Sequence, residues 1–389
     1  MTDLFNPLLS LKKGRWFKLI CGASFQHLPA VRSLTLAYTL AGADCIDVAA
    51  DPAVVAAAQE GLEVAATLGN SARKRGFACK GRPLLMVSLN DGEDPHFRKA
   101  KFDSNQCPTQ CSRPCERICP AQAITFDSIK YNHTGVLSEK CYGCGRCLPI
   151  CPYAKIETVS YVTANGAIAP LILKSGVDAV EIHTSVGRLA EFKKLWQAIS
   201  PYAEHLKLLA ISCTDGEGMI DYLQSLYDTI TPLNCVNIWQ TDGRSMSGDI
   251  GSGTTLATVK LGSKVLRANI PGYVQLAGGT NSYTVTKLKA MGLLKKLTKQ
   301  IDENMRENNE YSPTSGLGIK APEASIAGVA YGSYARKLLS PVLEQLEEKE
   351  VNVERVKVAA RLEDEPTLLW QAVSLAHELV SQLKYQEHR

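Results

Sequence analysis

CYGCGRCLPICP, residues 141–152, decides the fold of the middle of this chain, because its four cysteines follow the ferredoxin-type spacing C-x2-C-x2-C-x3-C-P. A second stretch, CPTQCSRPCERICP at residues 107–120, has the slightly looser spacing C-x3-C-x3-C-x3-C-P. Together they predict a bacterial-type ferredoxin module with two [4Fe–4S] clusters. The expected ligands are Cys107, Cys111, Cys115, Cys119, Cys141, Cys144, Cys147 and Cys151.

The two runs form a pseudo-twofold repeat in which the last cysteine of each is followed by proline. In two-cluster ferredoxins, the fourth cysteine of one run binds the cluster of the other run. We therefore expect Cys119 to join the cluster of the second run and Cys151 to join that of the first.

Two alternative roles for the cysteines, disulfide formation and zinc binding, have less support than cluster binding. Four disulfides are disfavoured because the chain shows no signal peptide, and zinc motifs usually separate two pairs of ligands more widely. The three-residue gaps of the first run leave the type and the potential of its cluster open. We expect most of the remaining cysteines to be small buried apolar side chains, since they lie in apolar segments: Cys21, Cys45, Cys79, Cys213 and Cys235.

Composition narrows the class of protein further. The 389 residues are 45% hydrophobic, which supports a large core. The net charge of +4 does not indicate a nucleic-acid-binding protein. No apolar run reaches the roughly 18 residues that a membrane span requires. Labile clusters in such a chain favour a reducing cytoplasm.

Outside the cysteine-rich segment, strands and helices alternate in eight units. The expected strands are Phe17–Cys21, Cys45–Ala49, Leu84–Leu89, Ala179–His183, Leu206–Ile211, Cys235–Gln240, Tyr273–Ala277 and Ser325–Ala330. The expected helices include Pro52–Leu68, Leu189–Ile199, Met219–Thr229, Thr254–Leu266 and Ser333–Leu346. Such alternation implies a parallel sheet, either doubly wound or closed. Eight units favour a (β/α)8 TIM-like barrel.

The cysteine-rich module is expected to be inserted in the third βα loop of this barrel. We predict residues 1–102 as the first part of the barrel, 103–157 as the module, 158–350 as the remainder and 351–389 as a helical extension. A helix at Ile168–Lys174 would lead into the fourth strand. Because βα loops lie at the C-terminal face, the clusters should lie over the barrel mouth, where barrel enzymes keep their chemistry.

Glycine-rich loops follow the seventh and eighth strands, where barrels commonly bind phosphate. A possible anion site, with flavin mononucleotide (FMN) as one candidate occupant, comprises Gly278, Gly279, Thr280, Asn281, Gly332 and Ser333. The alternative is that tight βα turns require these residues. No Ser/His/Asp or Cys/His arrangement indicates a catalytic nucleophile. His183 alone, at a strand end, is more typical of a hydrogen-bonded structural histidine than of a general base.

Two further stretches, IWQTDGR at residues 238–244 and IPGYVQLAGGTN at residues 270–281, complete a resemblance over essentially the full length. With the two cysteine runs, the chain resembles the light-dependent period protein A family of cyanobacteria. The resemblance implies an iron–sulfur protein of the circadian input apparatus, which reports light-dependent redox state to the clock. It also implies clock input partners such as a sensor histidine kinase. Quinones or ferredoxin are possible redox donors.

Two function classes follow. The first is a redox sensor or electron-transfer protein without an enzymatic reaction of its own. The second is an FMN-dependent barrel oxidoreductase that receives electrons from its own clusters. Flavin absorption in the purified protein would favour the second class, and a broad cluster band alone would favour the first.

Overall fold

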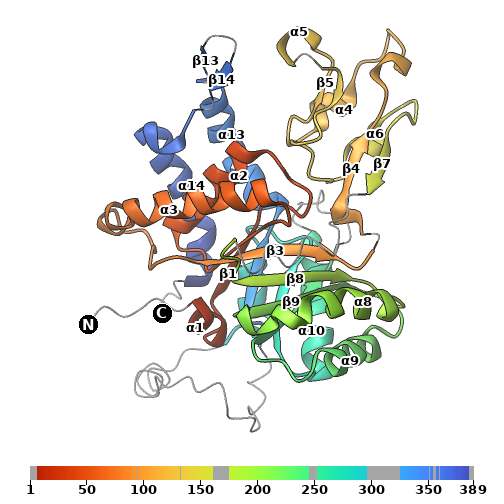
Figure 1. Cartoon of the computed structure of the whole chain (residues 1–389), viewed down its shortest axis with the longest axis vertical. Coiled ribbons are helices and arrows are strands. Elements are labelled where there is room, and N and C mark those ends of the chain that lie inside the picture. Colours follow the sequence, from red (N-terminus) through yellow and green to blue (C-terminus); the bar gives the residue numbers. More distant parts are fainter. Residues whose placement is uncertain are drawn as a thin grey trace.

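The computed structural model describes residues 7–92, 94–131, 133–160, 175–244, 251, 253–295, 325–349, 351–353, 356–358 and 360–384. The helix expected at Ile168–Lys174 lies outside these residues. The fold has a barrel, a module that projects from one end of it, and a group of helices packed along one side (Figure 1).

Eight parallel strands close into a barrel in the order β1-β2-β3-β8-β9-β10-β11-β12, with β12 pairing with β1. This confirms the predicted (β/α)8 architecture and excludes the open, doubly wound sheet. The strands are β1 (Trp16–Ile20), β2 (Cys45–Ala49), β3 (Leu84–Asn90), β8 (Ala179–Thr184), β9 (Leu208–Thr214), β10 (Val236–Asp242), β11 (Tyr273–Ala277) and β12 (Gly328–Tyr331).

Helices surround the barrel, with α8, α9 and α10 on one side and α2, α3, α13 and α14 on another (Figure 1). Their bounds are α1 (Pro7–Lys12), α2 (Leu28–Ala41), α3 (Pro52–Lys74), α8 (Leu189–Ile199), α9 (Met219–Ile230), α10 (Thr254–Ala268), α11 (Thr284–Ala290), α13 (Ser333–Glu347) and α14 (Pro366–Lys384). Helix α3 begins where the sequence predicts, because the Asp51 carboxylate accepts hydrogen bonds from the N–H groups of Ala53 and Val54.

The barrel interior changes from apolar to polar along the strands. Alternate side chains point inward, since a strand repeats every two residues. The first inward layer is apolar and includes Trp16, Met86 and Ile238, joined by Leu11 of α1. Two residues further along β1, Lys18 is fully buried, and polar residues begin to replace the apolar layer.

Lys18 connects four strands of the barrel. Its ammonium group donates hydrogen bonds to Glu181 of β8 and to the Gln240 side chain of β10, and lies 3.1 Å from Asp47 of β2. Gln275 of β11 extends this network, because its side-chain amide donates to Gln240 at 2.6 Å. A buried charge is tolerated only when it is paired in this way.

The module leaves the barrel after β3 and returns before β8, which confirms its predicted position in the third βα loop. At its base, β4 (Arg98–Lys101) pairs with β7 (Glu157–Ser160) in antiparallel fashion. The smaller elements are η1 (Pro95–Phe97), η2 (Ser104–Gln106), α4 (Pro114–Ile118), β5 (Ile124–Thr125), α5 (Ser128–Tyr131), β6 (Gly135–Val136) and α6 (Cys147–Ile150). The module stands above the end of β3, beyond the barrel (Figure 1).

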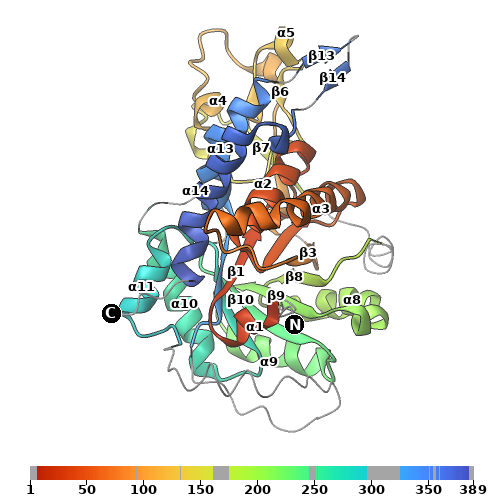
Figure 2. The same ribbon diagram turned by 90° about the vertical axis from the view of Figure 1, so that its left-hand side faces the viewer.

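The C-terminal segment packs back onto the barrel helices. It contains the hairpin of β13 (Val351–Val353) and β14 (Val356–Val358), then η5 (Leu362–Asp364) and α14. Helix α14 packs against α2 and α13, and Figure 2 shows it running beside them. The apolar face of α14 is buried, at Leu369, Val373, Ala376 and Val380. No helix in the described part of the chain combines the length and the apolar character needed to cross a membrane.

Barrel closure depends on Gly328, the first residue of β12, which pairs with Trp16 of β1. An added Cβ at Gly328 would lie 2.3 Å from the backbone oxygen of Trp16, which cannot move without disturbing β1. We expect Gly328→Ala to lower the free energy of unfolding by about 1–3 kcal/mol, the usual cost of overpacking. Gly253→Ala is the matched control, because its Cβ meets nothing within 4 Å and its φ is −74°. Urea unfolding measures both, and equal stability of the two variants would contradict the prediction.

Candidate iron–sulfur site and barrel mouth

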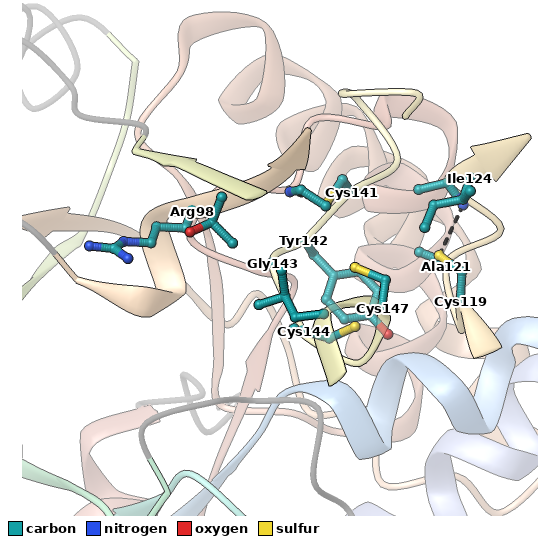
Figure 3. A pocket seen from close by; sticks show the side chains of 14 residues that line it. Arg98, Cys119, Ala121, Ile124, Cys141, Tyr142, Gly143, Cys144 and Cys147 are labelled. Carbon is teal, nitrogen blue, oxygen red and sulfur yellow. Dashed lines mark hydrogen bonds between the residues drawn. The ribbon is translucent and has the colours of Figure 1, made fainter. Parts of the chain in front are cut away.

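A cavity of about 160 Å³ lies within the module, and four cysteines line it. Cys141, Cys144 and Cys147 come from the second run, and Cys119 comes from the end of α4 in the first run. Figure 3 shows these four side chains around one space, with Tyr142 among them and the guanidinium of Arg98 pointing away. The cavity is roughly ten times the volume that one water-sized probe occupies. The apolar residues of its lining are Ala100, Ala121, Ala123, Ile124 and Leu148.

Cys151 lies with the first run instead of its own. It is close enough to Cys107 and Cys115 to act electrostatically on both thiols. Cys111 acts on the Cys107 thiol in the same way. The structure thus brings the eight cysteines together as two sets of four, each with one member from the other run. This is the arrangement that crossed ligation requires, and the ligand assignments themselves stay predictions.

The backbone after each run repeats, as the pseudo-twofold sequence pattern suggests. Gln122 and Ala154 stand three residues after Cys119 and Cys151, and have left-handed φ values of 48° and 49°. Each curl aims a backbone N–H at the preceding sulfur. The N–H of Ala123 donates to Cys119 Sγ at 3.2 Å, and that of Lys155 donates to Cys151 Sγ at 3.4 Å. N–H groups aimed at sulfur are a feature that iron–sulfur sites use to tune the potential.

Burial and neighbouring sulfurs disfavour thiolates in the cysteine-lined cavity unless a cation is bound there. Burial, together with the nearby Cys144, Cys141 and Cys119, raises the pKa of Cys147 to about 12. At Cys151 burial acts in the same direction, but backbone N–H groups led by that of Lys155 outweigh it and lower the pKa of the thiol. Four thiolates cannot share one cavity unless positive charge compensates them, and iron supplies that charge. The residues therefore fit an iron–sulfur cluster, which would supply one-electron transfer.

A second cavity, of about 50 Å³, lies at the barrel mouth. Five of the six residues of the predicted anion site line it, namely Gly278, Gly279, Thr280, Gly332 and Ser333. His96, His183 and Asp242 line the same cavity. A volume of this size holds a few water molecules.

Asn281 is used inside the fold instead. Its side-chain oxygen accepts from Thr255 and its amide donates to the backbone oxygen of Gly251. Gly278 and Gly279 have left-handed φ values of 58° and 96°, and a Cβ on either would lie within 3.1 Å of neighbouring atoms. Turn geometry and close packing account for these glycines without a ligand.

Tyr142 connects the two cavities. It was not predicted from the sequence to have this role. It stands between Cys141 and Gly143 and lines both spaces. The guanidinium of Arg336, from α13, lies 4.0 Å from the centre of its ring and donates to the backbone oxygen atoms of Ile20 and Cys21. An aromatic residue inside a cysteine run was the available signal, but its partner lies almost 200 positions away.

Two further contacts fix the module on the barrel. Lys140 forms an ion pair of 2.7 Å with Glu347 at the end of α13. Lys99 of β4 donates to the Gln26 side chain of the barrel at 2.7 Å, and within the module to the backbone oxygen of Ser138 at 2.8 Å. The Lys140–Glu347 ion pair joins the second cysteine run to α13. The Lys99–Gln26 hydrogen bond joins the base of the module to the loop after β1.

Fold and site define a class: a (β/α)8 barrel protein with an inserted iron–sulfur cluster-binding module. The profile of the LdpA Fe-S cluster-binding domain matches residues 107–162, and that of the light dependent period A C-terminal domain matches residues 171–382. Light dependent period A from Synechococcus elongatus is 46% identical, over 97% of this chain and 94% of that protein. The chain belongs to the light dependent period A family.

The module alone is similar to other iron–sulfur proteins. The arsenate respiratory reductase iron–sulfur subunit ArrB of a Shewanella species is 33% identical, over 17% of this chain and 34% of that protein. The electron transport protein HydN of Escherichia coli is 35% identical, over 17% of this chain and 33% of that protein. Among solved structures, fructose-bisphosphate aldolase from Campylobacter jejuni matches 97% of this chain and 92% of its own, with 9% identity and a TM-score of 0.38, from which we infer nothing.

Two arginines should tune the two cysteine sets separately. Arg336 acts on Cys144, whereas Arg113 acts on Cys107 and stacks on Phe126. A nearby positive charge favours the reduced, more negative state of a cluster, so its removal lowers the reduction potential. We expect Arg336→Gln to lower the potential of the cluster bound by Cys144, and Arg113→Gln that of the cluster bound by Cys107. A redox titration followed by electron paramagnetic resonance measures both, and a shift of the same signal in both variants would refute the assignment.

Proposed function

We propose that this protein holds two [4Fe–4S] clusters and uses them to relay light-dependent redox state to the circadian clock. The main support for two clusters is that each four-cysteine set contains one cysteine from the other run. Two clusters within one small module form a path for single electrons, as in the bacterial ferredoxins that this spacing resembles. The similarity of the module to an electron transport protein supports the same chemistry.

The two clusters would have different surroundings. The outer set (Cys107, Cys111, Cys115 and Cys151) has one buried cysteine, Cys115, whereas the inner set (Cys119, Cys141, Cys144 and Cys147) has two, Cys141 and Cys147. Large apolar side chains are exposed on either side of Cys151 of the outer set, at Ile150 and Tyr153. We propose that a redox donor, such as a quinone or ferredoxin, exchanges electrons at this outer rim.

The inner cluster is the proposed sensor. A change in its charge would act on Arg336, which touches both Tyr142 and the barrel backbone. Since Lys140 of the module also pairs with Glu347, the seam between module and α13 is where redox state would alter the surface. We propose that a clock input protein, such as a sensor histidine kinase, recognises the surface around this seam. The family to which the chain belongs supports this role.

The flavin-dependent oxidoreductase has less support. The mouth cavity of about 50 Å³ accommodates a few waters, which is far less than an isoalloxazine ring needs. The glycines of its rim are explained by packing, and Asn281 is engaged in the fold. The sensor function therefore accounts for more of what the site contains.

The cluster proposal is tested by analysis of anaerobically purified protein. We expect about eight iron and eight sulfide per chain, without flavin. Cys119→Ser should lower the iron to about four and remove the cluster of Cys141, Cys144 and Cys147, since it supplies their fourth ligand. Cys213→Ser is the matched control, because Cys213 is buried in β9, away from both sets. Four or fewer iron in the wild type, or stoichiometric FMN, would overturn the proposal.

The relay is tested by binding between this protein and the sensor histidine kinase of the clock input. We expect affinity to differ between dithionite-reduced and oxidised protein, because cluster charge changes at the seam. Cys119→Ser should bind equally under both conditions, whereas Cys213→Ser should keep the difference. If wild-type binding is the same in both redox states, the relay to this kinase is wrong even when the clusters are present.

A further inference from the structure

Three potential metal ligands meet at the barrel mouth, outside the cysteine sets. Asp94 and His96 lie in the loop after β3, and His183 lies near the end of β8. One ligand atom from each lies within 4.8 Å of the others. A tetrahedral ion with bonds of about 2.1 Å needs its ligands roughly 3.4 Å apart, so small side-chain rotations would close the set.

His183 carries the argument, because its two ring nitrogens have different surroundings. Its Nε2 lies 2.9 Å from a carboxylate oxygen of Glu181, which is fully buried. Its Nδ1 has no hydrogen-bond partner among the described residues and points towards Asp94, whose Oδ2 is 3.9 Å away. The side chain of His183 is 8% exposed, so bulk water does not readily satisfy that nitrogen.

Glu181 fixes the tautomer that a metal requires. A carboxylate next to Nε2 holds the proton there, which leaves the lone pair of Nδ1 free. Glu181 is itself held by Lys18 and Gln240, and the Phe97 ring packs edge-on against His183 at 5.1 Å. A carboxylate that orients a histidine from behind is the usual support of a metal-bound imidazole.

A purely structural role explains less of this geometry. The Asp94 carboxylate lies 2.9 Å from Nδ1 of His96 and accepts from the backbone N–H of the same residue at 2.7 Å, so this pair is self-sufficient. It gives His183 Nδ1 no partner, although a buried polar atom normally has one. A cation between Asp94, His96 and His183 would satisfy all three residues.

We propose that Asp94, His96 and His183 bind one divalent transition-metal ion at the barrel mouth, separate from the clusters. Two imidazoles and one carboxylate are a ligand set that suits Zn²⁺ or Fe²⁺ and leaves coordination positions open. His96 and His183 line the mouth cavity, so the open positions would face it. Asp242 lines the same cavity, and Tyr142 lines both this cavity and that of the inner cysteine set. The site does not depend on the proposed relay.

Zinc binding to the full-length protein tests the site. Anaerobic protein with both clusters intact is dialysed against micromolar ZnCl₂, and zinc and iron are measured by mass spectrometry on the same sample. We expect one zinc per wild-type chain, and binding weakened at least about 100-fold in His183→Ala and in His96→Ala. His205→Ala is the control, because His205 is an exposed histidine far from the mouth, after α8.

Iron content distinguishes a lost metal site from a lost fold. If His183→Ala loses iron, His96→Ala is the variant that tests the site. His96 is partly exposed, and its replacement leaves the buried Glu181 network in place. Zinc lost with normal iron supports the site, whatever the outcome of the kinase experiment. Equal zinc in the wild type and in both variants, or no zinc in the wild type, overturns it. Exchange of ZnCl₂ for FeSO₄ in the same dialysis identifies the preferred ion.

Discussion

The buried ammonium group of Lys18 is the constraint on which the barrel interior depends. It lies in β1 with Asp47 3.1 Å away and with Glu181 and Gln240 as hydrogen-bond partners, so one charge holds β1, β2, β8 and β10 in register. Removing a single partner from such a network leaves an uncompensated charge in a medium of low dielectric constant. The same network orients Glu181, and through it the ring of His183 at the mouth. Stability of the barrel and geometry of the mouth therefore have one physical origin.

The module is built on a different principle from the barrel. Its small apolar cluster contains Cys115 and Cys147 with Ile124, so the thiols themselves form part of its core. A module with so little apolar surface to bury depends on its metal for much of its folding free energy. Its attachment to the barrel is polar and aromatic, through Lys140 with Glu347 and Tyr142 with Arg336. Such contacts respond to charge, which suits the redox role proposed for the module.

The mouth is the place where both principles meet. Tyr142 belongs to a cysteine run, yet it lines the same cavity as His183 and Gly279 of the barrel. Inserting the module in the third βα loop makes this possible, because that loop rises from the face where all eight strands end. A change at the inner cysteine set can therefore reach barrel residues through direct contacts.

Local pattern determined much of this protein. The cysteine spacing predicted the module, and the alternation of strands and helices predicted the eight units of the barrel, since both patterns are set by residues close together in the sequence. Tertiary structure alone decided which distant side chains meet. Lys18 and Glu181 are 163 positions apart, and nothing local to either specifies the other. It also turned Asn281 into the fold and brought Asp94 and His96 to His183, because strand order and loop path, not spacing, determine which side chains share a cavity.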